Sequence, residues 1–352
     1  MILEFAPYIL KFKRPAGTSR GTYTEKPTCY LRLHDESSPG QYAYGEAAIF
    51  PGLSPEADDR FFYKLMELVA NFRIGRSTDL SRFPSLQCGL EQCFRDFAGG
   101  CRGLYFPSAF TEGEKTLTIN GLIWMGEYER MLSELNQKIE EGFKCIKIKV
   151  GAIDWRQEVS LIEHIRKSHS PEEITIRVDA NGGFSMEEAI PRLKRLADLG
   201  VHSIEQPIKA GNPELMSFLC KVSPTPIALD EELIGKFDKE EKQKLLDEIM
   251  PAYIVLKPTL TGGFSGTEEW IKLAEERGIG WWITSCLESN IGLNAIAQWT
   301  ATLDNPLPQG LGTGKLFVEN PETPIYLDGE NLEYDPNRGI DREWLENLDW
   351  RS

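Results

Sequence analysis

The sequence predicts an α/β protein in which a parallel barrel of the TIM type follows a smaller α+β domain. From about residue 116, short apolar runs alternate with amphipathic segments, a pattern typical of a parallel sheet covered by helices. The alternation yields eight strands, the number that closes such a barrel. A doubly wound open sheet is the competing interpretation, but it would normally carry a glycine-rich phosphate loop after its first strand, and the sequence has none there.

The first 110 residues have a different pattern. Three apolar runs joined by turn-rich pieces predict strands, at residues 8–14, 22–35 and 41–50. Two helical stretches follow, at 55–72 and 85–100. We therefore predict an α+β domain over residues 1–110, a barrel over 111–322, and a C-terminal segment, 323–352, that returns to the first domain.

The eight barrel strands are predicted at apolar runs of similar length. They are residues 116–121, 145–150, 174–180, 202–207, 226–232, 253–258, 281–286 and 308–314. One helix between them opens with a capping box, Ser185 and Glu188, and closes at Gly200. Six polar residues end consecutive strands at intervals of 25 to 30 residues, the length of one strand-helix unit: Lys149, Asp179, Glu205, Asp230, Lys257 and Ser285.

Charged side chains thus occupy the strand ends, where the catalytic groups of a TIM barrel lie. In the run 145–150, Lys147 and Lys149 alternate with apolar residues that would face the covering helices, so both ammonium groups would point into the barrel. Burying them is costly unless opposite charges are near. The next three strands end in carboxylates that supply those charges: Asp179, Glu205 and Asp230.

Three carboxylates at one rim of a barrel would repel one another and take up protons unless a cation lies between them. A single acid at a strand end is usually explained by a helix cap or a surface ion pair, but three on successive strands are not. Oxygen-only ligands favour a hard divalent cation. We therefore predict Mg²⁺ as the cofactor, held by Asp179, Glu205 and Asp230, with Mn²⁺ as a substitute.

Strands two and six of an eight-stranded barrel lie on opposite sides, so Lys149 and Lys257 would face each other across the pocket. Positive charge from Lys147 and the metal would favour the neutral form of Lys149, which can then act as a base. A lysine base beside a metal suits removal of a proton next to a carboxylate, because the metal takes up the charge that develops on the enediolate oxygens.

Composition excludes several classes of function. The 54 acidic residues outnumber the 39 basic ones, giving a net charge of −15, which argues against a nucleic-acid or anionic-membrane partner. No apolar run is long enough for a membrane span, and the N-terminal segment lacks the basic leader of a signal peptide. The seven dispersed cysteines show no metal-binding spacing and fit reduced thiols in the cytoplasm. The four histidines lie away from the catalytic strand ends, so none is expected to act as base or metal ligand.

The order K-x-K, D-x-N, E, D-E, K resembles the muconate-cycloisomerase-like branch of the enolase superfamily, and the flanking sequences resemble its o-succinylbenzoate synthase family. The segments concerned are KIKVG, RVDANGGF, IEQP, ALDEEL, LKPTLTGG, SCLESNIGLNAIAQ and GLGTGKLF. The early segment FKRPAGTSRG also resembles the mobile capping-domain loop of these synthases. The resemblance implies a modified TIM barrel of the (β/α)7β type, with the first domain as an N-terminal capping domain.

The resemblance also implies a role for each site residue. Lys149 would remove the α-proton and then help the hydroxyl to depart, while Lys257 would stay cationic and stabilise the enediolate. Lys147 and Asn181 would assist beside the metal and the base. Further residues would bind the substrate, most of them at its succinyl arm: Ser285, Glu288, Gly312, Thr313 and, from the early loop, Arg20. The implied substrate is a small carboxylate, 2-succinyl-6-hydroxy-2,4-cyclohexadiene-1-carboxylate, which loses water by syn-elimination to give o-succinylbenzoate in menaquinone biosynthesis.

Other functions fit part of this pattern. Two lysines on opposite faces also suit a two-base racemase, so an N-succinylamino acid racemase or a dipeptide epimerase is an alternative that the catalytic residues do not separate from the synthase. A barrel kept only as a binding scaffold would normally have lost one of the lysines or acids. A Schiff-base aldolase needs a lysine but no three-acid metal site.

Overall fold

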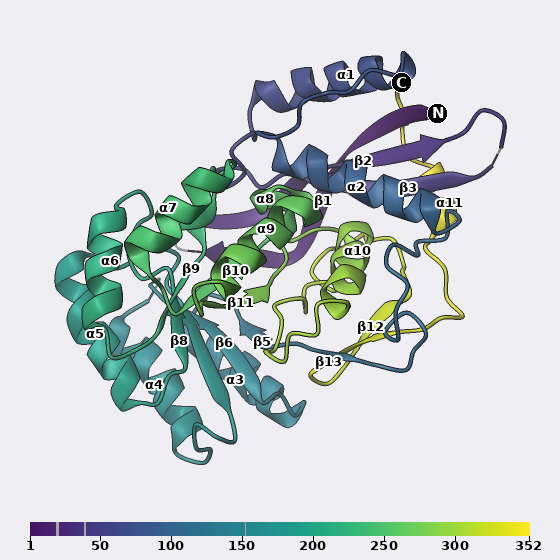
Figure 1. Ribbon diagram of the computed structural model, residues 1–352. Helices are drawn as coiled ribbons and strands as arrows, with labels where there is room; N and C mark the ends of the chain where they lie inside the picture. Colours follow the sequence, from purple (N-terminus) through teal and green to yellow (C-terminus); the bar gives the residue numbers. More distant parts are fainter. Residues whose placement is uncertain (19–20, 39, 152) are drawn as a thin grey trace.

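The computed structural model describes residues 1–18, 21–38, 40–151 and 153–352. An antiparallel sheet with two helices lies on one side of a curled parallel sheet that is wrapped by further helices (Figure 1). This arrangement confirms the predicted combination of an α+β part and a TIM-type barrel.

The antiparallel sheet contains three strands in the order in which they occur in the chain: β1 (Ile2–Thr18), β2 (Gly21–His34) and β3 (Tyr42–Ala48). Helices α1 (Asp59–Arg73) and α2 (Pro84–Ala98) cover it, and their apolar faces share a buried core with the sheet. All five elements were predicted. β1 starts earlier than expected, at Ile2, because its first residues pair with the last residues of β2. Ile2 lies opposite His34.

Two glycines set the distance between α2 and β3. Replacing Gly45 with alanine would place a Cβ 2.1 Å from the carbonyl oxygen of Gly89. Since helix and strand cannot separate without opening the core, we expect Gly45→Ala to lower the free energy of unfolding by about 1–3 kcal/mol, measured by urea denaturation. Gly339→Ala is the matched control, because a Cβ there would meet no described atom within 4 Å. Equal stability of the two variants would contradict the prediction.

Seven parallel strands form the barrel wall, each hydrogen-bonded to its neighbour in chain order. They are β5 (Gly121–Ile123), β6 (Cys145–Lys149), β7 (Thr175–Asp179), β8 (Ser203–Glu205), β9 (Ile227–Leu229), β10 (Tyr253–Leu256) and β11 (Gly280–Ile283). The connecting helices lie outside them: α3 (Tyr128–Glu140), α4 (Trp155–Arg166), α5 (Met186–Asp198), α6 (Pro213–Val222), α7 (Lys239–Ile249), α9 (Gly263–Glu275) and α10 (Asn290–Ala301). Two short helices follow strand ends, η1 (Glu231–Leu233) and α8 (Pro258–Thr261).

The barrel closes through a very short eighth segment. Gln309 bridges Ile119, and Gly310 bridges Thr284 at the end of β11, both in parallel orientation. The amide of Gly310 donates to the carbonyl of Ile283 at 2.7 Å. The predicted strand over 308–314 is therefore reduced to a few ladder contacts, because its glycines have no side chains to pack on a pleated surface.

The predicted first barrel strand, 116–121, was placed too early. Its start forms β4 (Leu117–Thr118), which leaves the barrel and pairs with a C-terminal hairpin made of β12 (Ile325–Asp328) and β13 (Asn331–Tyr334). The chain then passes α11 (Arg342–Glu346), and Arg351 pairs with Phe5 of β1 through two backbone hydrogen bonds of 2.9 Å. Both chain ends therefore lie at the capping sheet (Figure 1).

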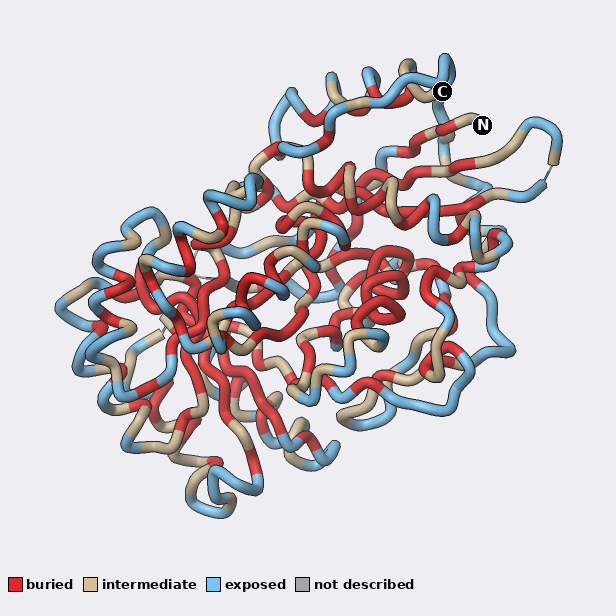
Figure 2. Tube along the Cα trace, in the orientation of Figure 1, coloured by how far each residue is buried: buried red, intermediate tan, exposed pale blue. Residues whose placement is uncertain are grey.

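Burial follows the alternation along the strands. Residues of the barrel strands, α10 and β3 are mostly buried, whereas the outer faces of the helices are exposed (Figure 2). On β6, Ile146 and Ile148 belong to the core shared with the helices, which leaves Lys147 and Lys149 to face the barrel interior. None of the described helices combines the length and apolar character needed to cross a membrane.

Candidate active site

A pocket opens at the carboxyl ends of the barrel strands, where the sequence predicted the site. It encloses about 710 Å³ of space, including the solvent at its open mouth. The capping domain contributes Phe50 and Leu53 to its wall. Most of the predicted site residues line it: Lys147, Lys149, Asp179, Asn181, Glu205, Lys257, Ser285, Gly312 and Thr313.

The two lysines of β6 find their opposite charges on the next strands. Lys147 Nζ lies 2.9 Å from Asp179 Oδ2 and also donates to Glu205 Oε2. Lys149 Nζ lies 3.0 Å from the same Asp179 oxygen and donates to Asn181 Oδ1 at 2.8 Å. The cost of burying both ammonium groups is thus offset by ion pairs within the pocket.

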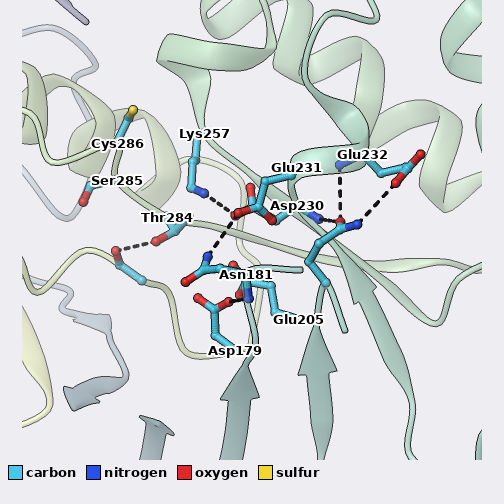
Figure 3. Close-up of polar contacts among 12 residues, drawn as sticks. Asp179, Asn181, Glu205, Asp230, Glu231, Glu232, Lys257, Thr284, Ser285 and Cys286 are labelled. Carbon is cyan, nitrogen blue, oxygen red and sulfur yellow. Dashed lines mark hydrogen bonds and ion pairs between the residues drawn. The ribbon is translucent and has the colours of Figure 1, made fainter. Parts of the chain in front are cut away.

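The strand register aligns the first two acids. Asp179 of β7 lies directly opposite Glu205 of β8, and the strands end at these residues. Just beyond them, Asn181 and Gln206 adopt left-handed backbone conformations, with φ of 44° and 40°. This uncommon conformation in residues other than glycine turns the chain sharply at the strand ends and keeps the carboxylates at the rim, as strained positions at functional sites often do (Figure 3).

The pKa values of Asp179 and Glu205 are shifted in opposite directions. Burial alone would raise the pKa of Asp179, but the ammonium groups of Lys147 and Lys149 outweigh it and hold that pKa well below its ordinary value. Burial, reinforced by the charge of Asp179, raises the pKa of Glu205 to about 8. The lysines thus leave Glu205 short of positive charge, so the pocket can take up a further cation there.

Lys257 lines the pocket, whereas Asp230 does not line it and reaches the site through its ion pair with Lys257. Asp230 follows β9, and its Oδ2 pairs with Lys257 Nζ at the end of β10 (Figure 3). Burial lowers the pKa of Lys257, but the charges of Asp230 and Glu205 outweigh this and raise it above its ordinary value. Lys257 therefore remains a cation across the pocket from β6.

The donor set fits a divalent metal, although the side chains do not yet converge on one point. Among the described residues, no three carboxylate, imidazole or thiolate groups form a ready-made metal cluster. The ammonium groups of Lys147 and Lys257 lie against the carboxylates instead. Glu205 Oε1 is buried and has no hydrogen-bond partner among the described atoms. An oxygen orphaned in this way, beside two further acids on adjacent strands, suits a hard cation.

The side chains expected at the succinyl arm divide into two groups. Ser285 Oγ lies 2.8 Å from Thr313 Oγ1, and Gly312 lies beside them in the pocket wall. Glu288 does not line the pocket, contrary to expectation. It is fully buried, where its carboxylate accepts hydrogen bonds from the amide of Cys286 at 2.8 Å and from the Thr259 hydroxyl. Arg20, the last predicted contact, lies outside the described residues.

Several pocket residues were not predicted. Asn120, Leu122 and Trp124 line the wall on the side of β5, and Trp124 lies under the ammonium of Lys149 at 5.9 Å from nitrogen to ring centre. Their alternation along the chain is a signal that could have been read, had the first strand been placed correctly. Phe50 and Leu53 had no such signal, because they reach the pocket only through the packing of the capping domain on the barrel.

The histidines lie where the sequence placed them, away from the pocket lining. His202 precedes β8 at the opposite end of the barrel, with a ring nitrogen 3.0 Å from Ser203 Oγ and the other 3.3 Å from the Tyr253 hydroxyl. Burial lowers the pKa of His202 to about 4, so it is neutral near pH 7.

Known proteins resemble this chain in sequence and in fold. Residues 130–330 match the family described as enolase C-terminal domain-like. Over 94% of its length, the chain is 45% identical to the o-succinylbenzoate synthase of Desulfotalea psychrophila, of which it covers 98%. The chain belongs to the o-succinylbenzoate synthase family of the enolase superfamily.

Solved structures agree with this family. The crystal structure of MenC from Desulfotalea psychrophila superposes with a TM-score of 0.84 at 41% identity, over 95% of this chain and 99% of that one. The dipeptide epimerase of Cytophaga hutchinsonii, solved in complex with Mg and D-Ala-L-Val, gives a TM-score of 0.81 at 23% identity, over 100% and 99% of the two chains. At this identity the second comparison shows a shared fold.

Proposed function

We propose that this chain is an o-succinylbenzoate synthase, a lyase that dehydrates 2-succinyl-6-hydroxy-2,4-cyclohexadiene-1-carboxylate in menaquinone biosynthesis. The observation that best supports this proposal is that Lys149 and Lys257 line the same pocket, together with carboxylates. The identity to the synthase of Desulfotalea psychrophila, which extends over nearly the whole chain, supports the same substrate.

Lys149 is the base. Asp179 and Asn181 hold its Nζ by two contacts of 3.0 and 2.8 Å, so the nitrogen has a defined position at the pocket surface. From there it removes the proton next to the substrate carboxylate, and the C–H electron pair moves into the enediolate. The same nitrogen then returns the proton to the departing hydroxyl on the same face, so that water leaves and the ring becomes aromatic.

Asp179, Glu205 and Asp230 are the residues that would hold Mg²⁺, or Mn²⁺ in its place. When bound, the metal supplies positive charge that stabilises the negative charge developing on the substrate carboxylate. Lys257 adds a fixed positive charge on the opposite side, and Lys147 balances the carboxylates of Asp179 and Glu205. This preorganised charge stabilises the enediolate more than the substrate, which is what lowers the barrier.

The substrate's succinyl arm lies along the wall made by Ser285, Thr313 and Gly312. The hydroxyl pair of Ser285 and Thr313 offers hydrogen bonds to a carbonyl or carboxylate oxygen. Gly312 completes this wall and packs closely on Ile119, since a Cβ at Gly312 would lie 3.0 Å from Ile119 Cδ1.

The test is loss of the cyclohexadiene's ultraviolet absorbance when purified protein is added with Mg²⁺. We expect rapid conversion, with o-succinylbenzoate identified as the product by mass spectrometry. Folded, Mg²⁺-loaded protein that leaves the absorbance unchanged would refute the synthase assignment.

N-succinylamino acid racemisation is the second candidate function, because two lysines on opposite faces can exchange protons with both faces of a carbon. Polarimetry with an N-succinyl-L-amino acid in D₂O measures it. Racemisation without dehydration would make the chain a racemase, and dehydration with racemisation would make it bifunctional. A dipeptide substrate in the same assay tests the epimerase alternative.

A further inference from the structure

Lys26 of β2 is a buried ammonium that makes no hydrogen bond among the described residues. Its side chain is 1% exposed, and its Nζ is buried and unpartnered. It lies opposite the fully buried Leu10 on the capping sheet and does not line the active-site pocket. Because an isolated charge in such a place is strongly destabilising, an opposite charge must lie within electrostatic reach.

Two fully buried carboxylates, Glu46 and Glu288, supply that charge. Thr28, two residues beyond Lys26 and so on the same face of β2, donates to Glu46 Oε1 at 2.7 Å. Burial raises the pKa of Glu288, and the charge of Lys26 opposes this while the charge of Glu46 adds to it. Lys26 and Glu46 thus both act electrostatically on Glu288, and the three buried side chains, one cation and two anions, are referred to as one cluster.

The cluster joins the capping domain to the pocket wall. Glu46 accepts hydrogen bonds from the Ser289 amide at 3.0 Å, the Ser289 hydroxyl at 2.6 Å and the Gly292 amide at 3.0 Å, all at the start of α10. Glu288, the preceding residue, accepts from the Cys286 amide at 2.8 Å. This holds the turn over residues 285–287, whose members all line the pocket.

The turn itself is conformationally costly. Leu287 adopts a left-handed conformation with φ of 56°, which a residue with a branched side chain rarely takes. Its amide lies 3.4 Å from Ser285 Oγ, the same hydroxyl that contacts Thr313. A turn of this kind persists only while its surroundings hold it, and the Glu288 carboxylate contributes by accepting the Cys286 amide.

We propose that Lys26 is a positioning residue: its ammonium, carried by the capping sheet, neutralises Glu288 and Glu46 and thereby fixes the 285–287 turn as the wall for the substrate's arm. The identity of that arm rests on the proposed function. The placement of the turn by the cluster does not, and it can be tested without substrate.

The experiment compares Lys26→Met with Lys242→Met in the full-length chain. Lys242 is also a buried lysine, 2% exposed, but it pairs with Glu269 at 2.7 Å and lies outside the active-site pocket. We expect both variants to lower Tm. Only Lys26→Met should raise KM, by about tenfold, with kcat changed less than threefold, because the base and the metal ligands are untouched. An unchanged KM in Lys26→Met would overturn the proposal.

A double-mutant cycle separates the cluster from simple destabilisation. Adding Glu288→Gln to Lys26→Met removes the unbalanced charge and keeps an acceptor for the Cys286 amide, so the double variant should recover much of the lost Tm. Losses that simply add would overturn the proposal, whether or not the chain turns over the cyclohexadiene. If Lys26→Met alone fails to fold, folding of the double variant supports the coupling, and its failure beside a stable Glu288→Gln single variant overturns it.

Discussion

Replacing Lys149 with alanine is expected to lower kcat for dehydration by at least about 10³-fold while leaving the protein folded, since a positioned base contributes about 10² to 10⁴ and here also protonates the leaving group. The fold should persist because Asp179 keeps its ion pair with Lys147. The measurement is the rate of absorbance loss at saturating substrate and Mg²⁺, with circular dichroism as the check on folding.

Lys144→Ala is the matched control for that variant. Lys144 is an exposed lysine just before β6, and its backbone, not its ammonium, carries its hydrogen bond to Glu330. Its replacement should leave kcat within about twofold of the parent. If Lys149→Ala retained more than a tenth of the parent rate, Lys149 would not be the base, and Lys257 would be the next residue to replace.

Removal of divalent metal by EDTA and gel filtration is expected to lower activity by at least about 10²-fold, with recovery on addition of Mg²⁺ or Mn²⁺. Glu205→Gln should weaken Mn²⁺ binding by about 10-fold or more, measured by electron paramagnetic resonance without substrate. The reason is that Glu205 holds a buried oxygen with no hydrogen-bond partner among the described atoms, which is the atom best placed for a metal.

Asp96→Asn is the control for the metal experiment. Asp96 is a buried acid of the capping domain that accepts hydrogen bonds from the amides of Tyr44 and Gly103, at 2.9 and 2.7 Å. Its replacement should lower Tm and leave Mn²⁺ affinity unchanged. Full activity after chelation would refute the metal site and, with it, the assignment of the three acids.

The strand ends were predictable because their pattern is local. Alternation along β6 turns Lys147 and Lys149 inward, and parallel strands in register bring Asp179 and Glu205 to the same rim. Spacing alone could therefore place these side chains near one another. The strand over 116–121 was misplaced for the same reason, since an apolar run shows that a strand forms but not which sheet it joins.

Contacts between the capping domain and the barrel could not be predicted in this way. Glu288 follows a strand end and was expected to touch substrate, yet it faces Thr259 and the buried cluster. Lys26 occurs in a strand of mixed polar and apolar residues and looks there like an ordinary surface lysine. Only the docking of two distant parts of the chain buries it.

The sequence by itself thus determined the barrel and the order of charged residues at its strand ends, because periodicity and charge pattern act over a few residues. The tertiary structure decided how the barrel closes at Gln309 and Gly310, and which apolar residues of the capping domain wall the pocket. It also decided which buried charges support the site. Those features depend on contacts between segments far apart in the chain. Such contacts remove a side chain such as Lys26 from water, so its charge needs opposite charges nearby.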